Sequence, residues 1–252
     1  KYLVETVSGQ AFQIYLQDRI LAPLDMRETY VKVPQEKMGK LLDYNYEHHI
    51  ICGRFNVLDR IIPGLPHDPK ARRLGESGAN LPGHAGLFST AGDMCKLAMG
   101  LLSGALLPAD MVNLIGCNRT GRMGDGYYRQ YMGLICFAKS PVRRLSEVPS
   151  WMGERAFALS GYTGNHIAID PDLGVFDLFL GNRCHNRLSL VEPPEAAASF
   201  GLSDDGSGEV LWPDGRRVKS SFQYVHYKDA LLHTPVHDCL KATGWLETKG
   251  NR

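Results

Sequence analysis

Three short segments combine glycine with histidine, serine or threonine, residue types that can bind or react with a substrate. Gly83–Thr90 leads directly into an expected helix, where glycines allow close backbone approach and the helix start offers free N–H groups. Leu159–Gly164 lies at the end of an expected strand, where backbone N–H groups can donate to a bound carbonyl. His67–Pro69 sets a histidine beside an aspartate, a pair capable of acid–base chemistry. From residue types alone, Gly83–Thr90 also fits an ordinary tight turn, Leu159–Gly164 a glycine-bearing hairpin and His67–Pro69 the start of a turn. The chemical and the purely structural interpretations therefore both stay open.

The chain contains none of the short motifs that place a nucleophile or a metal by themselves. G-x-S-x-G, H-E-x-x-H, the P-loop, S-x-x-K and Y-x-N are all absent from the sequence. The three segments therefore stand in a chain that lacks an obvious nucleophile–base pair.

Other clusters of reactive side chains are weaker candidates. His233 and His237 are four residues apart on an expected helix and share a face, which is compatible with metal binding. Because two histidines alone do not complete a zinc site, we predict no metal site. We expect the adjacent His48 and His49 to lie in a solvated loop. The arginine pairs are too small for a nucleic-acid surface; they are Arg143-Arg144 and Arg216-Arg217.

The composition is that of an ordinary globular protein and excludes several classes. The 252 residues carry 28 Lys and Arg against 27 Asp and Glu, a net charge of +1, so a nucleic-acid binder is not expected. No apolar run approaches the ~20 residues that span a bilayer, and we expect no membrane span in this chain. The 6 cysteines are scattered without a C-x-x-C pair, which slightly favours a cytoplasmic location; localisation otherwise stays open.

Hydrophobic periodicity and turn residues predict the elements that carry these segments. Thr90, with Asp93 three residues on, is expected to cap a helix. Residues 24–82 are expected to be mostly irregular, as a functional loop or a wrapping insertion. Helices followed by hairpins and a closing helix predict an α+β fold with an antiparallel sheet. The expected helices are 12–20, 90–102, 108–115 and 227–242, and the expected strands are 131–137, 157–160, 166–169, 175–180, 209–212 and 217–224.

Several segments, in their order, resemble the serine β-lactamase and penicillin-binding-protein superfamily, above all class C-like β-lactamase-related hydrolases and family VIII esterases. Gly83–Thr90 reads GHAGLFST and matches the family's pattern without a change. The resemblance covers most of residues 1–187, and the ordered set of motifs is specific although each motif is weak alone. The other matching segments are Val7–Gln10, Pro23–Met26, His67–Ala71, Gly161–Gly164, Ile169–Leu173 and Gly181–His185.

The resemblance implies a β-lactamase/transpeptidase-like fold, with an antiparallel sheet flanked by helices plus part of a helical lobe. In that family the S-x-x-K and Y-x-N motifs precede the segment that matches Val7–Gln10. We therefore expect this chain to be the C-terminal portion of such a protein, incomplete at its N-terminus. We expect residues 1–252 to form a single domain, with an insertion at 190–225 before the final helix.

The same resemblance assigns site residues. Leu159, Ser160 and Gly161 align with the family's K-T-G or H-T-G motif and are expected to bind substrate. Leu159 departs from that motif because it lacks the cationic or imidazole side chain. The backbone N–H of Tyr162 is expected to act catalytically by donating to the oxyanion, and His84 is expected to edge the substrate cleft.

The implied function is part of a serine hydrolase that forms an acyl-enzyme on an ester, amide or β-lactam bond. Its partner would be a small-molecule or peptide acyl substrate, and neither a metal nor an organic cofactor is implied. The alternative is a non-catalytic, ligand-binding relative on the same fold, which Leu159 and the absence of S-x-x-K favour. The oligomeric state is not predicted.

Overall fold

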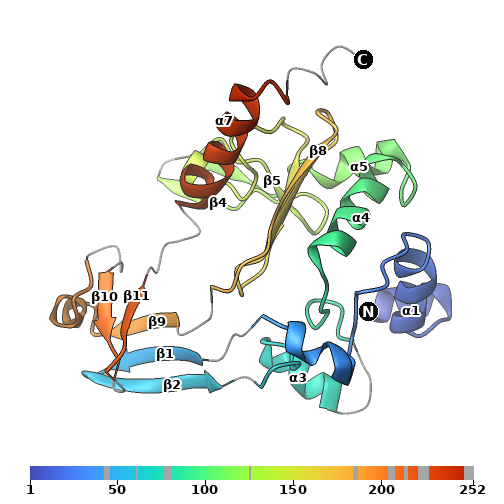
Figure 1. Cartoon of the computed structure of the whole chain (residues 1–252). Helices are drawn as coiled ribbons and strands as arrows, with labels where there is room; N and C mark the ends of the chain where they lie inside the picture. Colours follow the sequence, from blue (N-terminus) through green and yellow to red (C-terminus); the bar gives the residue numbers. More distant parts are fainter. Residues whose placement is uncertain are drawn as a thin grey trace.

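An antiparallel sheet of strand order β5-β6-β7-β8 lies between helices at the centre of the main body (Figure 1). The computed structural model describes residues 1–42, 46–60, 62–76, 81–124, 126–183, 187–203, 208–212, 215–220 and 227–246. Three of the four strands confirm the predictions for 157–160, 166–169 and 175–180, so the expected α+β fold is present. The four strands are Phe137–Ala138, Phe157–Ser160, His166–Asp170 and Val175–Phe179.

The turn between β7 and β8 is held by the buried side chain of Asp170. Its Oδ1 accepts the N–H groups of Asp172 and Leu173 at 2.9 and 3.0 Å, as expected for an aspartate that opens a turn. The resulting register pairs His166 with Phe179 and Ala168 with Asp177. His166 and Asp177 are therefore diagonal neighbours on one face of the sheet.

The predicted helices are present at their expected places. Thr90 Oγ1 accepts the N–H of Asp93 at 3.3 Å, which confirms the predicted cap of α4. π-helical turns at Gln17–Leu21 and Asp229–His233 complete the first and last predicted helices. The α-helices are α1 (Tyr2–Ser8), α2 (Phe12–Leu16), α3 (Pro69–Glu76), α4 (Ala91–Leu102), α5 (Ala109–Ile115) and α7 (Thr234–Ala242).

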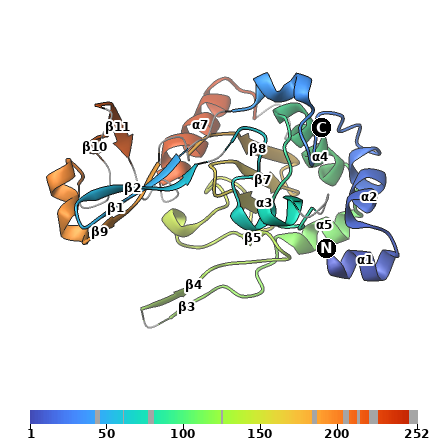
Figure 2. The same ribbon diagram turned by 90° about the horizontal axis from the view of Figure 1, so that it is seen from below.

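Helices cover both faces of the central sheet, and strand alternation decides which helix a side chain meets. Phe157 and Ile169 pack against Ala98 of α4 and Val112 of α5. Ala158 belongs to the opposite face, and Figures 1 and 2 show α7 on that side of the sheet. Neighbouring residues of one strand therefore meet different helices.

The segment 24–82 holds more regular structure than expected. It contains the 3₁₀ helix Gln35–Lys40, strands β1 (Tyr46–Ile51) and β2 (Arg54–Arg60), and α3. The prediction of a mostly irregular segment missed these elements, of which β1 pairs with β9 (Arg187–Glu192), a strand remote in the sequence. His48 and His49 consequently belong to a strand rather than to a loop.

The prediction of a strand at 131–137 is wrong for most of its length. Only Phe137–Ala138 joins the central sheet, and Met132 bridges back to Phe137. Ile135 turns the chain between them with φ +69°, a conformation that a β-branched residue rarely adopts. The preceding chain forms a separate hairpin of β3 (Arg122–Gly124) and β4 (Tyr127–Arg129).

A second group of strands packs around its own apolar core, apart from the central sheet in Figures 1 and 2. In it β1 pairs antiparallel with β2 and parallel with β9. The predicted second hairpin is present as β10 (Gly208–Leu211) and β11 (Arg217–Ser220), while 221–224 lie outside the described residues. The insertion at 190–225 and the single domain stay predictions. The core consists of Ile50, Leu188, Val191, Leu202, Val210 and Trp212.

Gly116 lies where the end of α5 touches the chain that leads into β6. A Cβ at this position would stand 2.0 Å from the carbonyl oxygen of Arg155, and a backbone atom cannot swing away. We expect Gly116→Ala to lower the free energy of unfolding by at least about 2 kcal/mol, since overpacking must shift the backbone. The matched control is Gly39→Ala, where a Cβ meets nothing within 4 Å. Urea unfolding of both variants checks this; equal stability of the two would contradict the packing.

No helix within the described ranges is both long and apolar enough to cross a membrane. The cysteines of these ranges are free thiols, and they are Cys52, Cys95, Cys117, Cys136 and Cys239. Cys184 lies outside the described residues.

Candidate active site

The three segments singled out in the sequence meet beyond the end of β6. The ring centroids of His67 and Tyr162 lie 5.4 Å apart. His84 Nε2 lies 3.1 Å from Asp68 Oδ1, within hydrogen-bond distance. These two contacts join His67–Pro69, Gly83–Thr90 and the Gly-Tyr-Thr-Gly turn into one cluster, the motif cluster. Tyr162 and His84 are both about half exposed, so the cluster borders solvent.

The turn that carries Tyr162 is braced by Arg183. The Arg183 guanidinium carbon lies 4.7 Å from the centroid of the Tyr162 ring, and its Nε donates to the Tyr162 carbonyl at 2.9 Å. The Arg183 backbone N–H donates to the carbonyl of Thr163 at 2.8 Å. Gly164 has φ +107°, and a Cβ there would stand 2.9 Å from the Arg183 backbone nitrogen, so glycine is required. The turn thus holds the Tyr162 backbone in place.

Asp68 has a structural as well as a potential chemical role. Its Oδ1 accepts the N–H of Ala71 at 2.8 Å and so caps α3, with Pro69 as the first helical residue. Burial alone raises the pKa of Asp68, but the hydrogen bonds from Ala71 and His84 hold that pKa below its ordinary value. The pair of Asp68 and His84 is therefore anchored at a helix start.

The segment that carries His84 is fixed by its neighbours in space. Phe88 and Tyr30 exchange two backbone hydrogen bonds of 2.8 and 2.9 Å. The buried Oδ2 of Asp93 accepts the Glu28 N–H at 2.7 Å and the Thr29 hydroxyl at 2.9 Å. This network ties the start of α4 to residues 28–30, which keeps the GHAGLFST segment in position.

Strand alternation separates the residues that align with the family's K-T-G or H-T-G motif. Leu159 lies on the face of Phe157, toward α4 and α5, and is about half exposed. Ser160 lies on the opposite face, where its hydroxyl donates to Glu147 Oε2 at 2.5 Å. The N–H of Gly161 donates to the carbonyl of Asn165 at 2.7 Å. Their expected role in binding substrate stays a prediction.

A buried charge cluster surrounds Ser160. Lys228 Nζ donates to Ser160 Oγ at 2.8 Å and forms an ion pair with Glu147. Burial lowers the pKa of Lys228 to about 8. Sequence reasoning missed Glu147 and Lys228, since 81 residues separate them and neither belongs to a motif. The only signal was a charged pair, Lys228-Asp229, on the buried face of the last helix.

Asp229 ties the start of the last helix to the loop before β6. Its Oδ2 accepts from Arg143 Nε at 2.5 Å and its Oδ1 accepts the Ser150 N–H at 2.8 Å. Arg143 also donates to the Thr234 hydroxyl at 2.7 Å. Burial raises the pKa of Asp229, but the bonds from Ser150 and Arg143 hold it below its ordinary value.

Loss of the Asp229 carboxylate should destabilise the protein only at pH values at which this carboxylate is ionised. We expect Asp229→Asn to lower the free energy of unfolding by about 2 kcal/mol at pH 7, because hydrogen bonds to a charged group are lost. The folded-state pKa lies below the unfolded value, so the contribution is present above pH ~4 and disappears as pH falls through the folded pKa. Urea unfolding at pH 7 and pH 3 tests this; a deficit that persists unchanged at pH 3 would contradict it.

Two histidines and an aspartate meet under the last helix. His233 Nδ1 lies 2.8 Å from Asp177 Oδ2, and the rings of His166 and His233 lie 4.7 Å apart. His166 Nε2 lies 2.8 Å from the Glu147 carbonyl oxygen. Burial, with the neighbouring His233, lowers the pKa of His166 to about 4, so the ring is neutral at pH 7.

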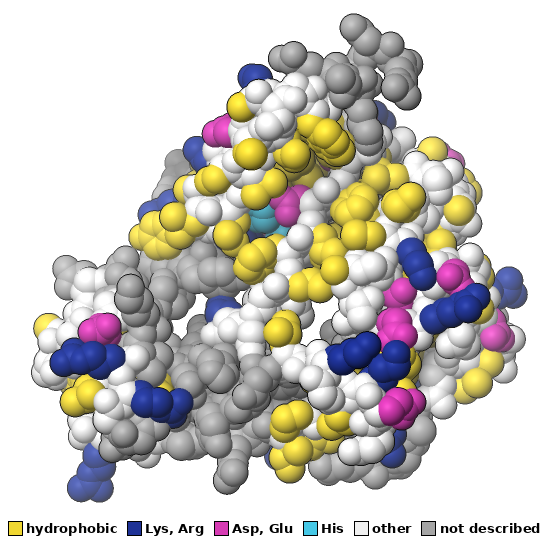
Figure 3. Space-filling view, in the orientation of Figure 1, with side chains coloured by type: hydrophobic (Ala, Val, Ile, Leu, Met, Phe, Trp, Pro, Cys, Tyr) yellow, Lys and Arg dark blue, Asp and Glu magenta, His cyan; other side chains and the backbone are white. Residues whose placement is uncertain are grey.

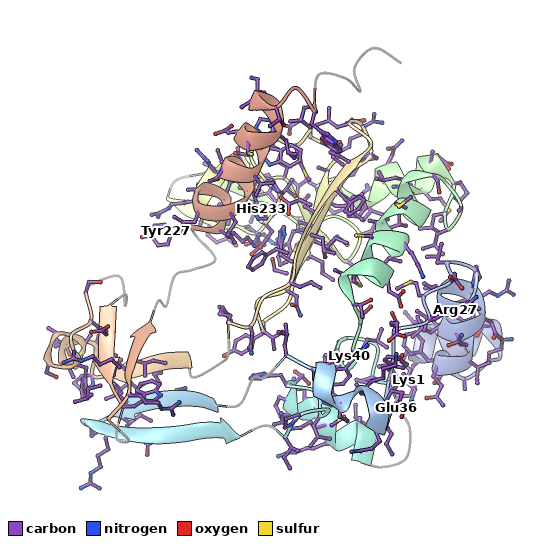
Figure 4. All side chains as sticks on the ribbon, viewed as in Figure 1. Lys1, Arg27, Glu36, Lys40, Tyr227 and His233 are labelled. Carbon is purple, nitrogen blue, oxygen red and sulfur yellow. The ribbon has the colours of Figure 1, made fainter. Side chains whose placement is uncertain are left out.

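Figures 3 and 4 show the same place from one side. At the position of His233 in Figure 4, Figure 3 shows a histidine recessed beside an acidic side chain and ringed by hydrophobic side chains. His237 shares the buried face of the helix with His233, as its spacing indicated, but it stacks on Trp151 with centroids 5.1 Å apart. The histidine ring that His233 contacts is that of His166.

A cavity of about 440 Å³ lies elsewhere, between the end of α5 and the chain around β5. Its lining includes Gly116, Tyr131, Lys139 and Arg143, and none of its residues belongs to the motif cluster. We therefore do not place the candidate site there.

The family model described as Beta-lactamase matches residues 1–199. This chain belongs to the β-lactamase family. Its membership agrees with the fold class and with the order of motifs expected from the sequence.

Two curated relatives show what this β-lactamase-family chain is similar to. It is 26% identical over 200 residues to a putative D-alanyl-D-alanine carboxypeptidase of Escherichia coli (strain K12), covering 75% of this chain and 44% of the relative. It is 25% identical over 210 residues to an N-acetylmuramyl-L-alanine amidase of Bacillus subtilis (strain 168), covering 77% and 44%. The chain thus spans less than half the length of these relatives.

The chain is also similar to several solved structures. The LovD6 mutant of simvastatin synthase from Aspergillus terreus has a TM-score of 0.47 at 20% identity, over 70% of this chain and 46% of that one. EstCE1, a hydrolase with promiscuous acyltransferase activity, has a TM-score of 0.47 at 18% identity, over 71% and 48%. A penicillin-binding-protein homologue from Caulobacter crescentus has a TM-score of 0.45 at 18% identity, over 71% and 48%.

Proposed function

We propose that this chain is part of a serine hydrolase that forms an acyl-enzyme on an ester, amide or β-lactam bond. The observation that carries the proposal is the motif cluster, in which His67, Asp68 and His84 gather around the turn of Tyr162. Membership of the β-lactamase family supports it. The names of the two curated relatives, a carboxypeptidase and an amidase, support an amide substrate.

In the proposed reaction this chain supplies one wall of the site. The nucleophile is the serine of an S-x-x-K motif, which is absent from these 252 residues and is proposed to lie in the longer polypeptide. Its attack turns the substrate carbonyl into an oxyanion, toward which the Tyr162 N–H would donate. The bracing of this turn by Arg183 would fix the donor before the substrate arrives. His84 would contact substrate from the cleft edge.

A non-catalytic ligand-binding relative is the second candidate, and Leu159 favours it. A leucine at this motif position offers neither a charge nor a proton. Lys228 does not replace the missing cation there, because its Nζ lies with Ser160 and Glu147 on the opposite face from Leu159. The two candidates differ in whether a covalent adduct forms.

Covalent labelling of the full-length protein distinguishes the two candidates. A fluorescent penicillin and an activated phosphonate are each incubated with the folded protein, and the labelled peptide is identified by mass spectrometry. We expect one adduct on the serine of S-x-x-K, abolished when that serine is replaced by alanine. If neither reagent labels a protein that is folded by circular dichroism, the hydrolase is contradicted, and a thermal shift with either reagent would support the ligand-binding relative.

A further inference from the structure

Two buried histidines under the last helix each have a ring nitrogen that makes no hydrogen bond to the described residues. His166 and His233 are only 3% and 2% exposed. Neither His166 Nδ1 nor His233 Nε2 has a hydrogen-bond partner in the part of the chain that the structure describes. A buried nitrogen that makes no hydrogen bond costs free energy, so its presence in two adjacent rings requires an explanation.

The hydrogen bonds on the opposite nitrogens fix where the protons are. His166 Nε2 faces the Glu147 carbonyl, which can only accept, so Nε2 carries the proton and Nδ1 keeps its lone pair. His233 Nδ1 faces the Asp177 carboxylate and carries the proton in the same way. Metal-binding histidines characteristically donate their other ring N–H to a carbonyl or a carboxylate, as His166 does to the Glu147 carbonyl.

A carboxylate accompanies the two rings. One ligand atom from each of His166, Asp177 and His233 lies within 4.8 Å of the other two. The neighbouring cation Lys228 is already paired with Glu147. Asp177 therefore remains to balance the charge of a bound cation. Because ligands at ~2.1 Å from a zinc ion lie at most about 4 Å apart, side-chain shifts of about 1 Å would close the site.

We propose that His166, Asp177 and His233 form a binding site for a divalent transition-metal ion, with Zn²⁺ as the preferred ion. Two imidazoles and one carboxylate are a ligand set that suits zinc. To bind the ion together with Asp177, His233 shifts its proton from Nδ1 to Nε2, so that Nδ1 and the Asp177 oxygen, 2.8 Å apart, both face the metal.

The metal would link the C-terminal helix to the sheet. The three ligands come from β7, β8 and the π-helical turn Asp229–His233, which is remote in sequence from both strands. His166 is also paired with Ser160 across β6 and β7. The ion would therefore hold the helix on the sheet face opposite Leu159. This inference does not depend on the proposed hydrolase activity.

Metal analysis of the full-length protein tests the site. The protein is stripped with a chelator, titrated with Zn²⁺ alone, and measured by inductively coupled plasma mass spectrometry and thermal unfolding. We expect one zinc ion per chain and a raised melting temperature. His166→Gln and His233→Gln should each weaken binding by at least ~100-fold, and Asp177→Asn by ~10–100-fold. The matched control His237→Gln removes a histidine from the same helix face and should bind zinc as the native protein does.

A spectroscopic measurement on the native protein covers the case in which the variants fail to fold. Cu²⁺ bound in place of zinc should show hyperfine splitting from two imidazole nitrogens in electron paramagnetic resonance. The proposal is overturned if the native protein binds no stoichiometric Zn²⁺ and its melting temperature is unmoved, or if His233→Gln and His237→Gln bind zinc equally.

Discussion

Acylation of the full-length protein by an activated phosphonate or a penicillin should fall by about 10²–10³-fold when Tyr162 is replaced by proline. Proline has no backbone N–H, and one oxyanion donor contributes about that factor in comparable sites. The surrounding turn would otherwise survive, because the side chain and backbone of Arg183 bond to the carbonyls of Tyr162 and Thr163 rather than to their N–H groups. Single-turnover labelling rates measure the effect.

Tyr162→Ala separates the backbone group from the ring. Alanine removes the contacts of the ring with His67 and Arg183 but keeps the N–H. We expect its labelling rate to stay within about tenfold of the native rate. If the proline and alanine variants are slowed equally, the N–H is not an oxyanion donor, and if neither is slowed, this turn lies outside the reaction. Melting temperatures of both variants show whether the fold is kept.

Replacing Glu147 with glutamine should lower the free energy of unfolding by about 3–5 kcal/mol, because it leaves the buried Lys228 ammonium without a counter-charge. Lys228 is 3% exposed, and its Nζ contacts only Glu147 and Ser160 among the hydrogen bonds described for it. The matched control is Glu154→Gln, whose ion pair with Lys139 involves a carboxylate that is 88% exposed. That change should cost no more than about 1 kcal/mol. Urea unfolding at pH 7.5 gives both values.

The double variant Glu147→Gln with Lys228→Met should recover most of the loss, because the unpaired charge is removed. The pH dependence provides a second check. Burial lowers the pKa of Lys228 to about 8 in the folded chain, against 10.5 ordinarily. Between these values the unfolded chain binds more protons, so stability rises with pH. In Glu147→Gln this rise begins at a lower pH, because loss of the carboxylate lowers the pKa of Lys228 further. The deficit of Glu147→Gln should therefore shrink between pH 7.5 and pH 9.5, and a constant deficit would contradict the assignment to Lys228.

Local sequence signals predicted much of the central body correctly. The cap of α4 follows from Thr90 and Asp93 alone, because a capping side chain reaches only three residues along the chain. The hairpin of β7 and β8 follows from the turn that Asp170 opens. The strands of the second sheet could not be predicted in this way, since β1 is stabilised by parallel pairing with the distant β9.

In the candidate site, too, some features follow from the sequence and others only from the tertiary structure. The motifs determined that His84 and Tyr162 belong to one family pattern, and the order of those motifs predicted the family. Only the tertiary structure decided that Ser160 meets Glu147 and Lys228, and that His166 meets Asp177 and His233. Capping and turn chemistry act between residues a few positions apart and can be read along the chain. Lys228 meets Glu147 across 81 residues and His233 meets Asp177 across 56, so these contacts depend on how the strands and the last helix pack.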